Sequence, residues 1–270
     1  GAVTDAALDA VLHSDADALL IAGDITNNGE KWSHDEIYEK LSRMIVKEKA
    51  AEPNPYADKI EALSPTFFAT PALALSRCYD ALYAMFIAAT NNIESAFTQL
   101  ESYDEKTAAW IAREEDNIDL LTDRLSNYLV QLSPHIKLEN QVLILDQYYK
   151  VVTEFERLGD HAMNIEEVAE HMQEKGIRFS EQAMEEIALM RELIERILRH
   201  TEQAFGKRDV DAANHIEPLE EVIDALCDEV KLHHIIRLQD GTCTLGQGFV
   251  FKVAAVGAEE FQLAAFGASV

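Results

Sequence analysis

Hydrophobic residues recur every three or four positions through the middle of the chain, which is the spacing of one buried face of a helix. The first such run follows Thr70-Pro71, a pair that marks a helix start because the missing N–H of proline costs nothing at the first helical position. Its apolar positions are Leu75, Tyr79, Leu82, Phe86, Ala89, Ile93, Ala96 and Leu100. The pattern predicts a long helix from Pro71 onward.

Four further helices are predicted, at about 105–132, at about 138–175, from Ser180 onward, and from Asp209 or Pro218 to about Ile235. The helix at 105–132 has Ile111, Ile118, Leu125 and Leu132 at sevenfold spacing, as in the seam of a helical bundle. Gly176 is expected to end the next helix as a C-cap. The region from about 65 to 240 is therefore predicted to be all-α.

Part of this helical region occurs twice. Residues 115–121 align with 220–226 at an offset of 105, and Ile111 falls on Ile216. The preceding helices also resemble each other, because 94–97 aligns with 202–205 at an offset of 108. We therefore expect two copies of one helical unit of about 105 residues.

The two ends of the chain lack helical periodicity. Residues 17–23 form a short apolar run that stops at Gly23-Asp24 and at the turn-rich 27–29, which is typical of a strand entering a loop. After Gly241 the residues are mostly small or apolar, and their pattern predicts no particular structure.

Charge narrows the possible functions. The chain has 49 Asp and Glu against 23 Lys and Arg, a formal net charge of −26 at pH 7. A nucleic-acid binder needs a clustered basic surface, so that class is excluded, and cations or basic or neutral surfaces are the expected partners. The three cysteines lie far apart, which predicts that the protein has no disulfide. The chain has no apolar run of about 20 residues and its N-terminus is acidic, so we expect a cytoplasmic protein.

Two pairs of acidic residues border the predicted buried faces. Glu115 and Asp119 stand four residues apart beside the Ile111 seam, and Glu220 and Asp224 repeat this arrangement. Like charges at this spacing repel by a few tenths of a kcal/mol. A cation is therefore expected to compensate them.

A third acidic group lies on the helix at 138–175. Val142, Leu145, Tyr149 and Val152 form an apolar stripe whose next members are Glu156 and Asp160, with Asn164 one turn further. We expect these residues to replace core positions, and buried carboxylates are costly unless they are paired or bind metal. Their oxygen ligands suit hard cations such as Mg²⁺, Mn²⁺ or iron, with Zn²⁺ as a further candidate.

Two other interpretations of these acids stay open. They can form a solvated face in an acid-rich protein, or Arg157 can pair with one of them and make metal unnecessary. His161, next to Asp160, is a further candidate ligand.

The same residues resemble a known family. Residues 156–164, ERLGDHAMN, resemble the ExxxDxxxN signature of the PhoU family, and 115–119 and 220–224 resemble its E(D)xxxD signature. The likeness covers about residues 53–250 and is greatest to the PhoU-like cytoplasmic domain of bacterial sodium/phosphate cotransporters. Thr70 to Leu75 also resembles the start of that domain.

This resemblance implies an all-α bundle of two three-helix repeats with metal clusters on the helix faces. It implies a non-enzymatic regulator of phosphate transport, which acts on the membrane domain of a phosphate transporter, or through a sensor kinase, at the inner face of the membrane. The second ExxxDxxxN is missing, since Phe261, Ala265 and Ser269 stand in its place. An incomplete sixth helix would leave apolar surface exposed, so we expect homo-oligomers or marginal stability.

A second resemblance concerns the N-terminus. Residues 5–43 resemble a fragment of a calcineurin-like metallophosphoesterase, with Asp24 as its metal-bridging aspartate, although the other motifs of that family are absent. The expected organisation is therefore an N-terminal segment (1–52), a PhoU-like bundle (53–250) and an atypical tail (251–270). Two alternative functions are a metal-dependent phosphoesterase that uses Asp24 and an acidic protein-interaction module without metal.

Overall fold

The computed structural model describes residues 54–240. The elements in chain order are α3 (Ala57–Ala62), η1 (Pro65–Ala69), α4 (Pro71–Glu101), α5 (Glu105–Leu132), η2 (Ser133–His135), α6 (Glu139–Lys175), α7 (Glu181–Lys207), α8 (Val210–Ala213) and α9 (Ile216–Gln239). The predicted strand at 17–23, the fragment around Asp24, the C-terminal tail and the sixth helix lie outside the described residues. The all-α prediction is confirmed for the part described.

Local chemistry sets most of the helix ends. α4 begins at Pro71, as predicted, and Gly176 ends α6 in the left-handed conformation with φ of 62°. Ser180 caps α7, because its hydroxyl accepts a hydrogen bond from the backbone N–H of Ala183 at 3.2 Å.

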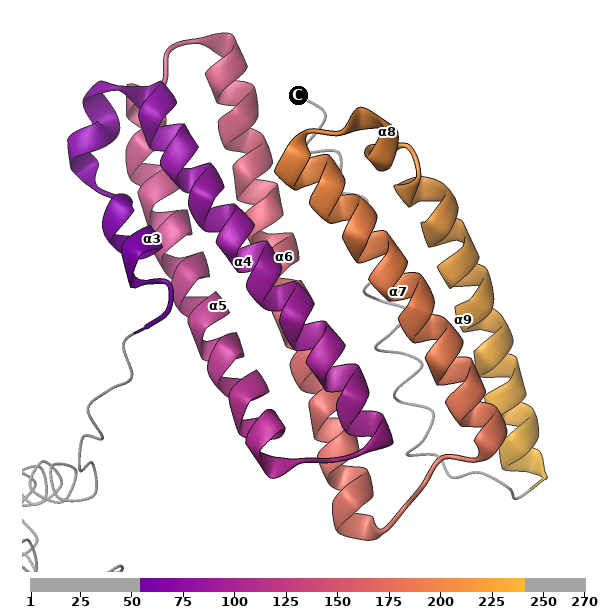
Figure 1. Ribbon diagram of the computed structural model, residues 1–270. Coiled ribbons are helices and arrows are strands. Elements are labelled where there is room, and N and C mark those ends of the chain that lie inside the picture. The colour runs from indigo at the N-terminus through magenta and orange to yellow at the C-terminus, as the bar shows by residue number, and fades with distance from the viewer. Residues whose placement is uncertain (1–53, 241–270) are drawn as a thin grey trace, which may run out of the picture. The chain divides into compact units, whose positions relative to one another are not determined.

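The long helices pack in two groups. α4, α5 and α6 lie side by side, and α7 packs against α9 with α8 at one end (Figure 1). The predicted seam of α5 is buried, since Ile111, Ile118, Leu125 and Leu132 are at most 1 % exposed. α7 also contacts α4, so the first group adjoins the second.

Both predicted copies occupy equivalent positions in the core. Ile111 and Ile118 of α5 are buried, and so are Ile216 and Ile223 of α9. The second copy differs from the first at its start. The residues that correspond to the first turns of α5 form the separate helix α8 and the turn after it. Pro218 explains this break, since its ring prevents a continuous helix from reaching the carbonyl of Asn214.

The length and composition of α4 would also suit a membrane span, with a mean hydropathy of 1.2 over one window. Our expectation that the chain has no such run is therefore wrong for α4. Half of that window is buried inside the bundle, which is the pattern of a core helix.

Two tyrosines of α4 hold the C-terminal end of α7. The Tyr79 hydroxyl donates to the backbone carbonyls of Phe205 and Gly206 at 2.8 and 3.1 Å, and the Tyr83 hydroxyl donates to Glu202 at 3.1 Å. The rings of Phe155 on α6 and Phe205 on α7 meet edge to face at 5.5 Å between centroids. Aromatic packing and hydrogen bonds therefore fix the contact between the repeats.

Candidate metal site on helices α5 and α6

The close approach of α5 and α6 determines where the acids lie. A Cβ atom added at Gly159 of α6 would lie 3.1 Å from Cδ1 of Ile118 on α5. Ile118 is almost completely buried, so glycine at 159 leaves the room that this isoleucine occupies. The contact brings the residues on either side of Ile118 next to those around Gly159.

Four of the predicted ligands meet at this contact. Glu115 and Asp119 of α5 act electrostatically on Asp160 and Glu156 of α6 across the interface. Glu115 and Glu156 are half-buried, whereas Asp119 and Asp160 are exposed. We call these four residues the acidic cluster.

Three carboxylates of the acidic cluster have raised pKa values. Burial, followed by the charges of Asp119 and Asp160, raises the pKa of Glu115. Burial and the Asp160 charge raise the pKa of Asp119. Burial, Asp160 and Asp119 raise the pKa of Glu156, and Arg157 partly opposes this shift. The surface therefore favours anything that supplies positive charge, whether a proton or a cation.

The acids border the core rather than replace it, which corrects our interpretation of the apolar stripe on α6. Leu145 and Val152 of the stripe are buried, but Val142 is 49 % exposed, and the buried face continues through Phe155, Leu158, Ala162 and Ile165. At about 100° per residue, the stripe therefore follows one edge of the buried face, with Val142 and Asp160 on its outer side.

The other polar residues of α6 are oriented by their own helix. The side-chain amide of Asn164 donates to the backbone carbonyl of Asp160 at 2.8 Å, so its nitrogen faces its own helix. Arg157 forms an ion pair with Glu154 at 3.6 Å. Arg157 therefore contacts an acid other than Glu156, although its charge still acts on Glu156.

The second predicted pair lies on α9. Glu220 is half-buried and Asp224 is exposed, on either side of the buried Ile223. The segment predicted to oppose them lies beyond residue 240, outside the described part. Within residues 54–240, no three His, Cys, Asp or Glu side chains stand close enough together to hold a metal ion as they are placed.

A separate cavity of about 560 Å³ lies where α4 and α6 end and α7 begins. Leu100, Tyr103, Met172 and Phe179 contribute to its lining, and none of the predicted site residues does. The acidic cluster is thus a feature of the α5–α6 surface and not of this cavity.

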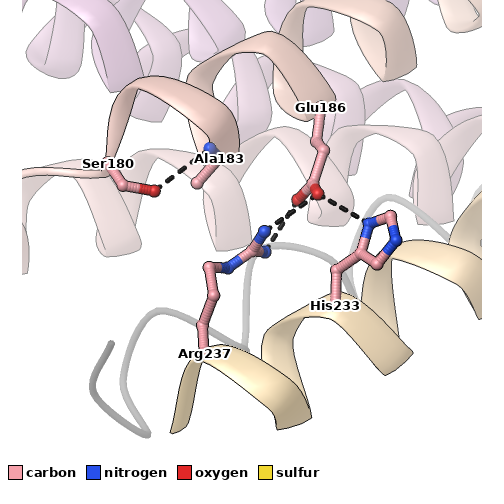
Figure 2. A network of polar contacts seen from close by, with 5 residues as sticks. All are labelled: Ser180, Ala183, Glu186, His233 and Arg237. Atoms are coloured by element: carbon pink, nitrogen blue, oxygen red, sulfur yellow. Dashed lines mark hydrogen bonds and ion pairs between the residues drawn. The ribbon is translucent and has the colours of Figure 1, made fainter. Parts of the chain in front are cut away.

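A polar network that the sequence analysis missed holds α9 against α7 (Figure 2). Arg237 of α9 donates to both carboxylate oxygens of Glu186 on α7, at 2.9 and 2.7 Å, and His233 Nδ1 lies 2.9 Å from the same carboxylate. Burial would raise the pKa of Glu186, but the hydrogen bonds from Arg237 and His233 outweigh it and lower that pKa. In the sequence, His233 and Arg237 stand four residues apart and so share one face of α9, and this spacing was the signal that could have indicated the network.

The helices that form this site also match a known family. Residues 82–169, from α4 to α6, match the family model described as the PhoU domain. This segment is therefore similar to a PhoU domain. The matched segment includes all four members of the acidic cluster and Asn164, whereas Glu220 and Asp224 lie beyond it.

Two curated relatives agree with the PhoU assignment. The chain is 23% identical to "Phosphate-specific transport system accessory protein PhoU homolog 1" of Thermotoga maritima over 63% of this chain and 73% of the relative. It is 25% identical to the PhoU homolog of Clostridium acetobutylicum over 56% of this chain and 69% of the relative. Both are accessory proteins by name, which confirms the prediction of a non-enzymatic protein.

The fold agrees as well. The crystal structure of PhoU from Pseudomonas aeruginosa superposes with a TM-score of 0.67 at 16% identity, and it covers 72% of this chain and 94% of that one. The predicted PhoU-like helical bundle is thereby confirmed as a fold.

Proposed function

We propose that this protein is a metal-binding regulator of phosphate transport that acts on or beside a phosphate transporter. The observation that carries the proposal is the acidic cluster, in which α5 and α6 bring four carboxylates to one interface within a PhoU domain. The relatives named as accessory proteins of phosphate-specific transport support the transporter as the partner.

The acidic cluster would bind a hard cation. Its donors are all carboxylate oxygens, which suit Mg²⁺, Mn²⁺ or iron better than soft metals, with Zn²⁺ as a further candidate. Asn164, one turn beyond Asp160, would add an amide oxygen. A bound cation would neutralise the repulsion across the interface and link α5 to α6.

The identity of the transporter, the second partner and the second metal site are proposed from the resemblance to the PhoU family. The transporter domain would be the membrane part of a sodium/phosphate cotransporter, with the bundle at its cytoplasmic face and a sensor kinase as a second partner. Glu220 and Asp224 would provide a second metal site on α9.

A thermal melt tests metal binding directly. The wild type is compared with Glu156→Ala/Asp160→Ala in chelator and then in Mn²⁺, and Glu167→Ala/Glu174→Ala serves as a control with two exposed acids removed from the same helix. Mn²⁺ should raise the Tm of the wild type and the control, and leave the Tm of Glu156→Ala/Asp160→Ala unchanged.

Equal responses in all three proteins would refute the acidic cluster as the metal site. Full stability in chelator together with no response to Mn²⁺ would favour the acidic interaction module. Phosphodiester hydrolysis that disappeared in Asp24→Ala would favour the phosphoesterase.

A further inference from the structure

A cluster of basic side chains occupies one face of α7, in a chain whose formal net charge is −26. Arg196, Arg199 and His200 share this face, because they stand three and four residues apart. His215, which precedes α9, stacks on His200 with ring centroids 5.2 Å apart and planes 8° from parallel. Both arginines and His215 are exposed and His200 is half-buried, so the four side chains form one accessible surface.

Three of the nearby acidic residues accept hydrogen bonds from groups outside the cluster. Glu195 accepts from Arg191 at 2.8 Å, Glu202 accepts from Tyr83 at 3.1 Å, and Asp209 caps α8 by accepting from Ala212 N–H at 3.1 Å. Within residues 54–240, neither arginine of the cluster forms an ion pair. The cluster therefore carries positive charge that no direct ion pair neutralises within these residues.

The helix macrodipole does not account for these arginines. A helix C-terminus favours cations only within its last turn, and α7 ends at Lys207, two to three turns after Arg199 and Arg196. The macrodipole therefore accounts for the position of Lys207 but not for the positions of Arg196 and Arg199.

One ring nitrogen of His215 is available to a ligand. His215 Nδ1 lies 2.6 Å from the backbone carbonyl of Asp211, and because a carbonyl only accepts, Nδ1 donates and Nε2 remains for a ligand. His200 Nδ1 is buried without a hydrogen-bond partner among the described residues. Burial and the charges of His215, Arg196 and Arg199 lower the pKa of His200, and Asp209 opposes them weakly.

We propose that Arg196, Arg199, His200 and His215 bind a phosphate-type oxyanion, either free or as the phosphoryl group of another molecule. Guanidinium groups and imidazole donors form charge-assisted hydrogen bonds to such oxygens. The site goes beyond the proposed function, since it lies on α7 and at the residue before α9 and uses no residue of the acidic cluster.

An NMR titration of the 270-residue chain with inorganic phosphate tests the site, in chelator and at constant ionic strength. The ring signals of His200 and His215 should shift saturably. Arg196→Gln/Arg199→Gln should weaken the apparent affinity about tenfold or more. The control Arg124→Gln/Lys137→Gln removes two exposed cations elsewhere and should leave the affinity unchanged, with circular dichroism to show that both variants fold.

A second arm distinguishes the source of the anion. A short phosphoserine peptide that binds more tightly than phosphate, while its unphosphorylated form does not bind, would identify a phosphoryl group, and equal affinities would identify free phosphate. The absence of any saturable shift, equal shifts in Arg196→Gln/Arg199→Gln, or the same shifts with chloride would overturn the proposal. Chelator excludes metal-bound phosphate, so this outcome is independent of the metal site.

Discussion

At the scale of residues, the chemistry of the acidic cluster depends on proximity between helices. Glu115 and Asp119 on α5 would be ordinary surface acids if α6 did not bring Glu156 and Asp160 beside them. Because the pKa values of Glu115, Asp119 and Glu156 are raised by burial and by neighbouring charges, the folded protein binds protons at these carboxylates more tightly than the unfolded chain does.

This proton binding predicts a pH dependence of stability. In chelator, the free energy of unfolding of the wild type should rise as pH falls from 7 toward the raised carboxylate pKa values, relative to Glu115→Gln/Glu156→Gln. The stabilisation is full below the unfolded-state pKa values and is lost as pH rises through the folded-state values. Urea unfolding at a series of pH values measures the difference between the two proteins.

The histidines do not obscure that difference. The pKa values of His200 and His234 are lowered, chiefly by burial, so they contribute stability that is lost as pH falls, and they do so in both proteins. Parallel pH profiles for the two proteins would contradict the prediction.

Gly159→Ala should destabilise the bundle by about 1 kcal/mol. Its new Cβ would lie 3.1 Å from the buried Ile118, and overpacking costs about 1–3 kcal/mol, which exceeds the gain in helix propensity of about 1 kcal/mol. Chemical denaturation measures the change. Ile118→Val removes the Cδ1 atom that clashes. Gly159→Ala should therefore lower the free energy of unfolding less in the Ile118→Val background than in the wild type. Strictly additive effects of the two substitutions would count against this contact.

Some of these residue-scale features could be predicted from sequence. The pairs Glu115/Asp119 and Glu156/Asp160 follow from spacing on a single helix. Their meeting depends on the contact between Ile118 and Gly159, which joins residues 41 positions apart and leaves no local pattern.

At the scale of elements, the network of Glu186, His233 and Arg237 fixes α9 on α7 (Figure 2). Arg237→Ala should cost about 3 kcal/mol of stability, because the side chain of Glu186 is only 11 % exposed and would lose its main partner. Hydrogen exchange should then accelerate within 216–239 more than within α5. Glu186→Leu/Arg237→Met should recover most of the stability, and a double variant as unstable as Arg237→Ala would refute the buried-charge explanation.

Element boundaries were predicted best where one residue decides them. Pro71, Gly176 and Ser180 each act through their own backbone or side chain, and the helices begin or end at them as expected. The start of α9 was ambiguous because Asp209 and Pro218 are both helix-start residues, and each has an effect: Asp209 caps α8, and Pro218 lies in the first turn of α9. The α6 stripe follows the edge of the buried face and not its centre, because the spacing of apolar residues on one helix does not show how far the buried face extends to either side.

At the scale of the whole molecule, apolar side chains remain exposed along α9. Val222, Leu232 and Ile236 are 46–56 % exposed and lie on one side of this helix. We expect the chain to self-associate, so that its average mass in sedimentation rises with protein concentration. Leu232→Lys/Ile236→Lys should lower that mass, whereas Leu189→Lys on α7 should not, and a wild type that stays monomeric throughout would refute this expectation.

The hydrogen bonds of Tyr79 determine where this protein can be divided. The last carbonyls of α7, which its own helix cannot satisfy, are satisfied by a side chain from the first repeat. A fragment that started at Glu181 would contain a complete α7 with a frayed end, although its sequence would show nothing missing. The boundary between the repeats is therefore a boundary in sequence only, and the smallest stable fragment has to retain α4.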